Sequence, residues 1–183
     1  MARLIDKEKV VAVIGEIASS NSIAAAEIAE ARKVPQVAVT STNPLVTQGK
    51  KFVSRVCFID PLQGTALAEF AGKTLKAKKV AILVDIEQDY SVGLTNYFKE
   101  RFEKKYKGQI LEVRYKSGDQ EFSAQLAQAL AFNSDVIMFT GYYNEIALAA
   151  QQARAMGYKG YFIAGDGADA PELIKIGGQA VEG

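Results

Sequence analysis

The chain has 183 residues, 49% of them apolar, so it is long enough to bury the core of one domain or of two small ones. Its net charge of +1 argues against a nucleic-acid partner, and its apolar runs are too short to cross a membrane. Histidine is absent and Cys57 is the single cysteine, which argues against a zinc site and a Cys–His nucleophile. No cofactor or metal is therefore expected, and Cys57 is expected to be a small buried side chain.

Short apolar segments, predicted to be strands, alternate along the chain with amphipathic segments, predicted to be helices. The predicted strands lie at 10–15, 36–41, 52–58, 79–85, 109–115, 135–141 and 160–167. The predicted helices lie at 22–33, 90–106, 121–132 and 145–157. Four of the strands are nearly continuous apolar runs, which is typical of parallel strands covered on both faces. The alternation predicts a three-layer α/β fold, in which an open, mostly parallel sheet lies between two layers of helices.

One stretch, 42–61, interrupts this alternation. There "TNPLVTQGK" and "IDPLQG" surround a lone strand. Pro and Gly are typical of turns and linkers, so the stretch predicts a domain boundary near Asp60 and Pro61. The predicted domains are 1–59 and 60–183.

The segments that follow the predicted strands contain the candidate site residues. Ligands of open α/β sheets bind beyond the carboxyl ends of the strands. In the first domain these positions carry hydroxyl groups near a helix start, which suit a carboxylate. In the second domain they carry aromatic rings and an acid, which suit an ammonium group. The sequence thus predicts a site for a zwitterion, with a carboxylate at one end and an amine at the other. Its candidate residues are the polar residues at 19–22 and 40–43, together with Tyr90, Tyr142, Tyr143 and Asp166.

Each of these residues also has a purely structural interpretation. Ser19 to Ser22 fit the cap of the following helix, and residues 40–44 fit a turn. Asp166 fits a turn as well. The adjacent pair Tyr142 and Tyr143 is harder to explain by packing, because both large aromatic residues stand at the exit of a strand.

Six segments of the sequence resemble one known family, in the same order and over essentially the whole chain. They are "LIDKEKVVAVIGEIASSNS", "STNPLVTQGKKFVSRVCFIDPLQG", "DYSVGL", "SGDQEFSAQL", "TGYYNE" and "GDGADAPELIKIGGQAVEG". Each segment alone is a weak signal, but six in order are specific. The chain resembles the type I periplasmic substrate-binding proteins of ABC transporters for branched-chain amino acids (leucine, isoleucine and valine).

The resemblance implies a fold of two flavodoxin-like (Rossmann-like) lobes, joined by three crossovers, with an amino acid bound between them. Residues 1–59 would be part of lobe I with its first crossover strand, and 60–183 would be lobe II. The carboxylate-binding positions of the family fall on Ser19, Thr40, Ser41 and Thr42. Tyr90 and Tyr142 would line the pocket, and Asp166 would receive the ammonium group.

The resemblance also implies partners and a location. The protein would bind a small-molecule amino acid, without catalysis, and would dock on the permease of an ABC transporter in the periplasm or another extracytoplasmic space. The first residues, "MARLIDKEK", lack the apolar segment of a signal peptide, so the chain as given would be cytoplasmic.

Family members are longer at both ends, which predicts a truncated chain whose lobe II lacks its last strand and whose amino acid binding is weakened. The apolar strand at 10–15 would be an unpaired edge, which predicts a homodimer formed through residues 1–59. Two other functions remain open. One is a stand-alone flavodoxin-like half-receptor with a structural or assembly role and no ligand. The other is a small α/β enzyme, against which the absence of histidine and of glycine-rich phosphate motifs argues.

Overall fold

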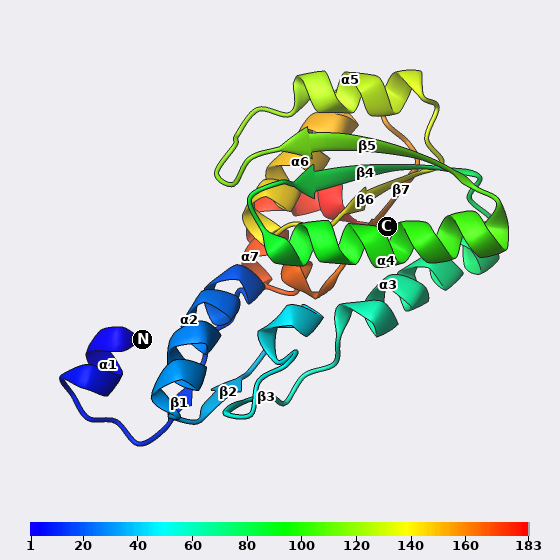
Figure 1. Ribbon diagram of the computed structural model, residues 1–183. Coiled ribbons are helices and arrows are strands. Elements are labelled where there is room, and N and C mark those ends of the chain that lie inside the picture. Colours follow the sequence, from blue (N-terminus) through cyan, green and yellow to red (C-terminus); the bar gives the residue numbers. More distant parts are fainter. Residues whose placement is uncertain (183) are drawn as a thin grey trace. The chain divides into compact units, whose positions relative to one another are not determined.

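The computed structural model of the chain describes residues 1–182, and these form two compact units: unit 1 is Met1–Leu62, and unit 2 begins at Gln63. Each unit has a parallel β-sheet of its own (Figure 1). Within residues 1–182, no helix is both long and apolar enough to cross a membrane.

Unit 1 contains a small three-stranded sheet. Its strands are β1 (Val13–Ile14), β2 (Gln36–Ala38) and β3 (Val53–Arg55), which pair in parallel in the order β1-β2-β3. Its helices are α1 (Ala2–Asp6), α2 (Ser19–Arg32) and the 3₁₀ turn η1 (Pro44–Val46). All three strands are shorter than predicted. β1 begins only at Val13, and it ends before Gly15, whose φ of +132° takes the backbone out of the strand region.

The core of unit 1 is small. Helix α2 packs on β2 and β3, and the core cluster comprises Ala26, Ala29, Ala38, Val46 and Val53. Three of these five side chains are alanines, which bury little apolar area each. Other apolar side chains of the unit remain in solvent, among them Val11 (87% exposed), Ile14 (80%) and Ile17 (65%).

Unit 2 contains a four-stranded parallel sheet that confirms the predicted fold class. Its strands are β4 (Lys79–Asp85), β5 (Gln109–Tyr115), β6 (Val136–Phe139) and β7 (Tyr161–Ala164). They pair in the order β5-β4-β6-β7. β4, the first strand of the unit in sequence, is therefore an inner strand, and β5 lies beside it at the edge of the sheet. Strands β4 and β5 match the prediction residue for residue, whereas β6 and β7 end earlier, where the chain turns toward helices.

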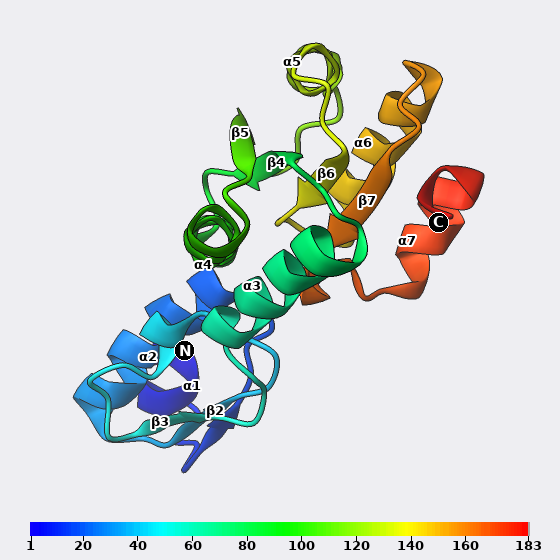
Figure 2. The same cartoon turned by 90° about the vertical axis from the view of Figure 1, so that its right-hand side faces the viewer.

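Helices cover both faces of this sheet. The helical elements are α3 (Asp60–Glu69), the π-helical turn η2 (Phe70–Thr74), α4 (Asp89–Tyr106), α5 (Ser123–Ala131), α6 (Tyr143–Ala155), η3 (Asp166–Ala168), α7 (Pro171–Gly177) and η4 (Gly178–Val181). Helices α3 and α4 lie on one face of the sheet, and α5 and α6 lie on the other (Figure 2). Central strand β4 serves both cores, because its side chains alternate: Val80, Ile82 and Val84 face α3 and α4, whereas Ala81 and Leu83 face α5 and α6.

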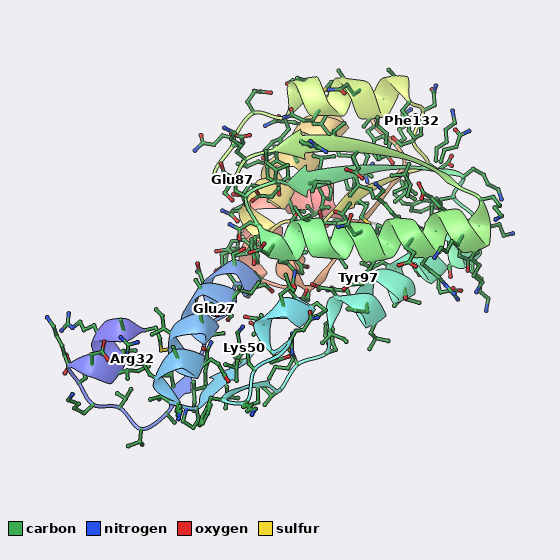
Figure 3. The ribbon with its side chains drawn as sticks, viewed as in Figure 1. Glu27, Arg32, Lys50, Glu87, Tyr97 and Phe132 are labelled. Carbon is green, nitrogen blue, oxygen red and sulfur yellow. The ribbon has the colours of Figure 1, made fainter. Side chains whose placement is uncertain are left out.

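Helix α3 was not predicted, because Pro61 and Gly64 interrupt its helical pattern. The structure explains Gly64 by close packing on α4. A Cβ atom at Gly64 would lie 2.7 Å from Tyr97 Cβ and 2.8 Å from the Phe98 backbone nitrogen. Figure 3 labels Tyr97 on the side of α4 that meets α3. The absence of a side chain therefore lets α3 approach α4 and fixes the position of the residues beside Gly64.

An ion-pair cluster at the carboxyl-terminal end of α3 gives a pH-dependent contribution to stability. The Glu69 carboxylate accepts hydrogen bonds from Lys105 Nζ (2.6 Å), Tyr106 Oη (2.6 Å) and Arg101 Nε (2.7 Å). These bonds, that of Lys105 foremost, lower the pKa of Glu69 from 4.5 to about 2. A carboxyl group with a lowered pKa in the folded state stabilises the fold above its unfolded pKa, and this contribution disappears as the pH falls through the folded pKa.

We therefore expect Glu69→Gln to lower the free energy of unfolding at pH 7, with a difference from wild type that shrinks between about pH 4.5 and about pH 2. Urea denaturation at several pH values measures this. Glu100→Gln, which removes an exposed pair with Lys104, is the matched control and should have a smaller effect. Equal effects of the two substitutions at every pH would contradict the role of the cluster.

Candidate functional site

The hydroxyl residues of unit 1 connect two loops beside the N-terminus of α2. Ser41 Oγ donates to the Ile17 carbonyl (2.8 Å), and it lies 2.6 Å from Ser22 Oγ. Ser19 Oγ accepts a hydrogen bond from the Asn43 backbone N–H (3.2 Å). These bonds hold the 40–43 loop against the start of α2, whose first backbone N–H groups have no partner within the helix. The arrangement suits an anionic group of a ligand.

The two threonines of this loop have different environments. Thr40 is exposed, and its hydroxyl donates to the Ile17 carbonyl (3.3 Å). Thr42 is buried, and its Oγ1 has no hydrogen-bond partner within residues 1–182. A buried hydroxyl without a partner is costly, so Thr42 Oγ1 is a candidate ligand group. Ser41, in contrast, uses its hydroxyl within unit 1.

Arg55 of β3 organises the same loop and was missed in the sequence. Its guanidinium donates to the carbonyls of Ser41 (2.7 Å), Asn43 (2.9 Å) and Pro44 (3.2 Å). The four acceptors, with Thr47 Oγ1 at 2.8 Å, are uncharged, so the guanidinium charge is not cancelled by them. The one available signal was a charged residue within a largely apolar predicted strand. Cys57, expected to be buried, is half-buried, with Sγ 3.5 Å from the Ser41 carbonyl.

In unit 2, two tyrosines stack at the carboxyl end of the sheet. The rings of Tyr90 and Tyr142 have centroids 5.5 Å apart and an interplanar angle of 30°. Tyr90 is 2% exposed and belongs to the core, and its hydroxyl accepts a hydrogen bond from the Gly167 N–H (3.0 Å). Tyr142 is half-buried and occupies the N-cap position of α6, without a capping hydrogen bond from its side chain. The buried Tyr90 ring thus supports one face of the Tyr142 ring. Tyr142 is the more exposed of the two and is therefore the tyrosine that a ligand can contact.

Asp166 begins the η3 turn that follows β7, and Gln63 of α3 holds it. The Asp166 backbone N–H donates to Gln63 Oε1 (2.6 Å), and Gln63 Nε2 donates to Asp166 Oδ1 (3.0 Å). Asp166 Oδ2 accepts no hydrogen bond from residues 1–182. A half-buried carboxylate with one oxygen still available is suited to an ammonium group. Gln63 was not among the predicted residues.

A hydroxyl network beneath these residues fixes α4 to the ends of the strands. Ser91 Oγ accepts a hydrogen bond from the Asp85 N–H (2.9 Å) and lies 2.8 Å from Thr140 Oγ1. Asp85 is buried, and its carboxylate accepts hydrogen bonds from Ser117 Oγ (2.6 Å) and the Glu87 N–H (3.0 Å). Burial, together with the nearby Asp85 carboxylate, raises the pKa of Tyr115. The network places the start of α4, and with it Tyr90, at the carboxyl ends of β4 and β6.

The structure brings Tyr90, Tyr142 and Asp166 together within unit 2, and Ser19, Thr40, Ser41 and Thr42 together within unit 1. Figure 1 shows the arrowheads of β4 and β5 at one edge of the unit 2 sheet. Among residues 1–182, no group of acidic or cysteine side chains is arranged to hold a metal ion. The two groups of residues offer hydroxyls, a carboxylate, an aromatic ring and backbone N–H groups, which suit polar recognition.

Comparisons with known proteins agree with this chemistry. A family model described as "Periplasmic binding protein" matches residues 1–183. An amino acid binding protein of Pseudomonas aeruginosa is 31% identical over 177 residues, covering 96% of this chain and 47% of the relative. The leucine-specific-binding protein of Salmonella typhimurium is 31% identical over 172 residues, covering 93% of this chain and 46% of the relative.

Solved structures show the same likeness. A leucine binding protein from Thermotoga maritima is 64% identical with a TM-score of 0.98, over 100% of this chain and 52% of that one. A branched-chain amino acid transporter substrate binding protein from Streptococcus pneumoniae, in complex with isoleucine, is 30% identical with a TM-score of 0.86, over 96% of this chain and 50% of that one. The chain thus spans about half the length of the relatives that it matches.

Proposed function

The chain belongs to the periplasmic binding protein family, and we propose on this premise that it binds a branched-chain amino acid, leucine foremost, for an ABC transporter. The observation that carries the proposal is the grouping of Asp166 with the stacked pair Tyr90 and Tyr142. Relatives with leucine in their names, one of them 64% identical, support this choice of ligand.

Unit 2 supplies the groups for the ammonium end of the amino acid. Asp166 Oδ2 would accept a charge-assisted hydrogen bond from the ammonium group, while Gln63 occupies Oδ1. The Tyr142 ring would offer its negative face to the same cation. Because Tyr90 lies behind Tyr142, the ring is held in place before the ligand arrives.

Unit 1 supplies the groups for the carboxylate end. The first N–H groups of α2 and the hydroxyls of Ser19 and Thr42 are the proposed donors, and Thr42 Oγ1 is the one whose hydrogen bond is still to be made. The Thr40 hydroxyl, like that of Ser41, already donates to the Ile17 carbonyl. Ser41 contributes mainly by shape, because its hydroxyl is bound to the Ile17 carbonyl. Arg55 holds the loop in place and adds positive charge to the unit.

We propose further that the 183-residue chain binds its amino acid weakly, because unit 1 has a small core to hold the carboxylate-binding groups. Longer proteins of the family would dock on a transporter permease in the periplasm. Calorimetric titration of the chain with leucine, isoleucine, valine, alanine and glutamate tests the function. Heat from the branched-chain amino acids alone supports it, and equal heats from all five, or from none at millimolar concentration, would count against it.

Two other functions fit parts of the structure less well. A half-receptor with an assembly role and no ligand would leave the pairing of Gln63 with Asp166, and the buried Thr42 hydroxyl, without a purpose. A small enzyme would need a general base or a nucleophile within the site, and the chain contains no histidine. A binding function without catalysis is therefore the proposal that the geometry supports best.

Unit 1 also supports the proposal of a homodimer, with a second copy of the chain as the occupant of its apolar surface. Ile14 and Ile17 line a groove of about 280 Å³, together with Met1, Leu4, Val13, Gly15, Glu16 and Ala25. Ile14 and Ile17 are 80% and 65% exposed, and β1 pairs with β2 alone within residues 1–182. A second copy would cover both the apolar side chains and the strand edge.

We expect light scattering to give the mass of a dimer at micromolar concentration and that of a monomer for Ile14→Lys. Val92→Lys, at an apolar residue of α4 that is 40% exposed, is the control and should leave the mass unchanged. A wild-type chain that is monomeric at this concentration would contradict the proposed dimer.

A further inference from the structure

Gln63 bonds to Asp166 through both ends of its side-chain amide, although 103 positions separate the two residues in the chain. We propose that Gln63 is the positioning residue of the amino acid site, which holds the Asp166 carboxylate in the orientation that receives the ammonium group. The proposal rests on the proposed function, and it adds a residue whose role lies in the orientation of another side chain.

The two hydrogen bonds require an amide at position 63. Gln63 Oε1 accepts from the Asp166 N–H at 2.6 Å, which fixes the backbone of the turn. Gln63 Nε2 donates to Asp166 Oδ1 at 3.0 Å, which fixes the rotation of the carboxylate. An acid at this position would keep the first bond, but at neutral pH it would replace the second with repulsion between two carboxylates. Gln63 is 9% exposed, so water cannot easily take its place.

Gln63 itself is rigidly placed. Its neighbour Gly64 lies against Tyr97 and the Phe98 backbone, so α3 cannot shift along α4 without a change in this contact. An amide on such an anchored helix has a fixed location, which a residue on a mobile loop would lack.

The turn that carries Asp166 is held from a second helix as well. Tyr90 of α4 accepts a hydrogen bond from the Gly167 N–H at 3.0 Å. The Tyr90 hydroxyl and Gln63 Oε1 both face Gly165, where a Cβ atom would lie 2.9 Å from Gln63 Oε1 and would also meet Tyr90 Oη. Residues 165–167 are therefore held by α3 and α4 together, and Asp166 Oδ2 is directed by contacts that exist before any ligand binds. Preorganisation of this kind strengthens a charge-assisted bond, because the carboxylate loses little freedom on binding.

The test replaces the Gln63 amide with a carboxyl group. We expect Gln63→Glu to bind leucine at about pH 8 roughly tenfold more weakly than wild type, because a charge-assisted bond loses its geometry. Near pH 5.5 its affinity should recover, since the introduced carboxyl group lies beside the Asp166 carboxylate, holds a proton to a higher pH than an isolated glutamate does, and can then donate as the amide does. The Tyr90 hydroxyl is the other titratable group that meets Gly165. Nuclear magnetic resonance titration of the 183-residue chain with leucine at both pH values measures the affinities.

Three further variants and readouts complete the test. Gln128→Glu, on the exposed surface of α5, adds the same charge and should bind as wild type does at both pH values. Gln63→Met removes both hydrogen bonds to Asp166, so its affinity for leucine should fall and should not recover at low pH. This variant replaces Gln63→Glu in the test if Gln63→Glu does not fold. Without ligand, the Asp166 and Gly167 amide signals should move between pH 8 and pH 5.5 in Gln63→Glu, far more than in wild type.

Gln63→Glu with the affinity and pH profile of wild type would overturn the positioning role, as would unchanged affinity in Gln63→Met. A wild-type chain that shows no leucine-dependent shifts at either pH would instead overturn the proposed function. In that case the signals without ligand decide whether Gln63 holds Asp166: pH-dependent movement in Gln63→Glu alone supports it, and the absence of that movement rejects it.

Discussion

Asp166→Asn is expected to weaken leucine binding by roughly ten- to a hundredfold. The substitution keeps the shape of the side chain and an Oδ1 atom that can accept from Gln63 Nε2, but it removes the negative charge that would pair with the ammonium group. A hydrogen bond to a charged group contributes about 1.5–3 kcal/mol, and each 1.4 kcal/mol corresponds to a factor of about ten in the dissociation constant. Titration of both chains with leucine measures the ratio.

Asp169→Asn provides the matched control for this result. Asp169 lies three positions further along and is exposed, so its substitution changes the net charge equally without touching the proposed site. N-acetyl-leucine, which has no ammonium group, should bind wild type and Asp166→Asn with similar weakness. Equal leucine affinity of wild type, Asp166→Asn and Asp169→Asn would show that Asp166 is not the ammonium ligand.

The second large effect concerns the affinity of the 183-residue chain itself. We expect leucine to bind it two to four decades more weakly than it binds the Thermotoga maritima relative, which is 64% identical and about twice as long. The reason is the small core of unit 1, in which five buried side chains support the loops that carry the carboxylate-binding groups. Two charge-assisted bonds that are no longer held in place, at about 1.5–3 kcal/mol each, account for a loss of this size.

Parallel titrations of the two proteins under the same conditions measure this difference. A dissociation constant of the 183-residue chain in the millimolar range would agree with the expected loss. Affinities within tenfold of each other would mean that unit 1 holds its half of the site well despite its small core, and the proposal of weakened binding would then be wrong.

Sequence patterns predicted unit 2 closely where the strands are long and apolar. β4 and β5 agree because each is a seven-residue segment rich in apolar and β-branched residues, and the parallel pairing agrees with strands that are connected through helices. Helices α3 and α7 were missed, since proline and glycine lie within both and their burial comes from tertiary packing. In unit 1 the strands are two or three residues long, so boundaries drawn from hydrophobicity extended too far.

The candidate site likewise contains residues that the sequence predicted and residues that it did not. Tyr90, Tyr142 and Asp166 were predicted because each follows a strand, and the geometry of an open sheet gathers such residues. Gln63 and Arg55 were missed because their roles consist of hydrogen bonds to residues elsewhere in the fold: Gln63 to Asp166, 103 positions away, and Arg55 to carbonyls of the 41–44 loop. Neither role leaves a periodic pattern in the sequence. The burial of Tyr90 was likewise visible only once α4 was placed on the sheet.

The measurement that tests the central claim most directly is a map of amide signal changes, by nuclear magnetic resonance, during titration of the 183-residue chain with leucine. We expect saturable changes, with a millimolar midpoint, at residues 141–143 and 165–167 in unit 2 and at 19–22 and 40–43 in unit 1. The same groups should respond to isoleucine and valine, and only weakly to N-acetyl-leucine. Signals that stay unchanged with all three amino acids, or that change only on α5 and α7, would contradict the assignment of an amino acid site to these residues.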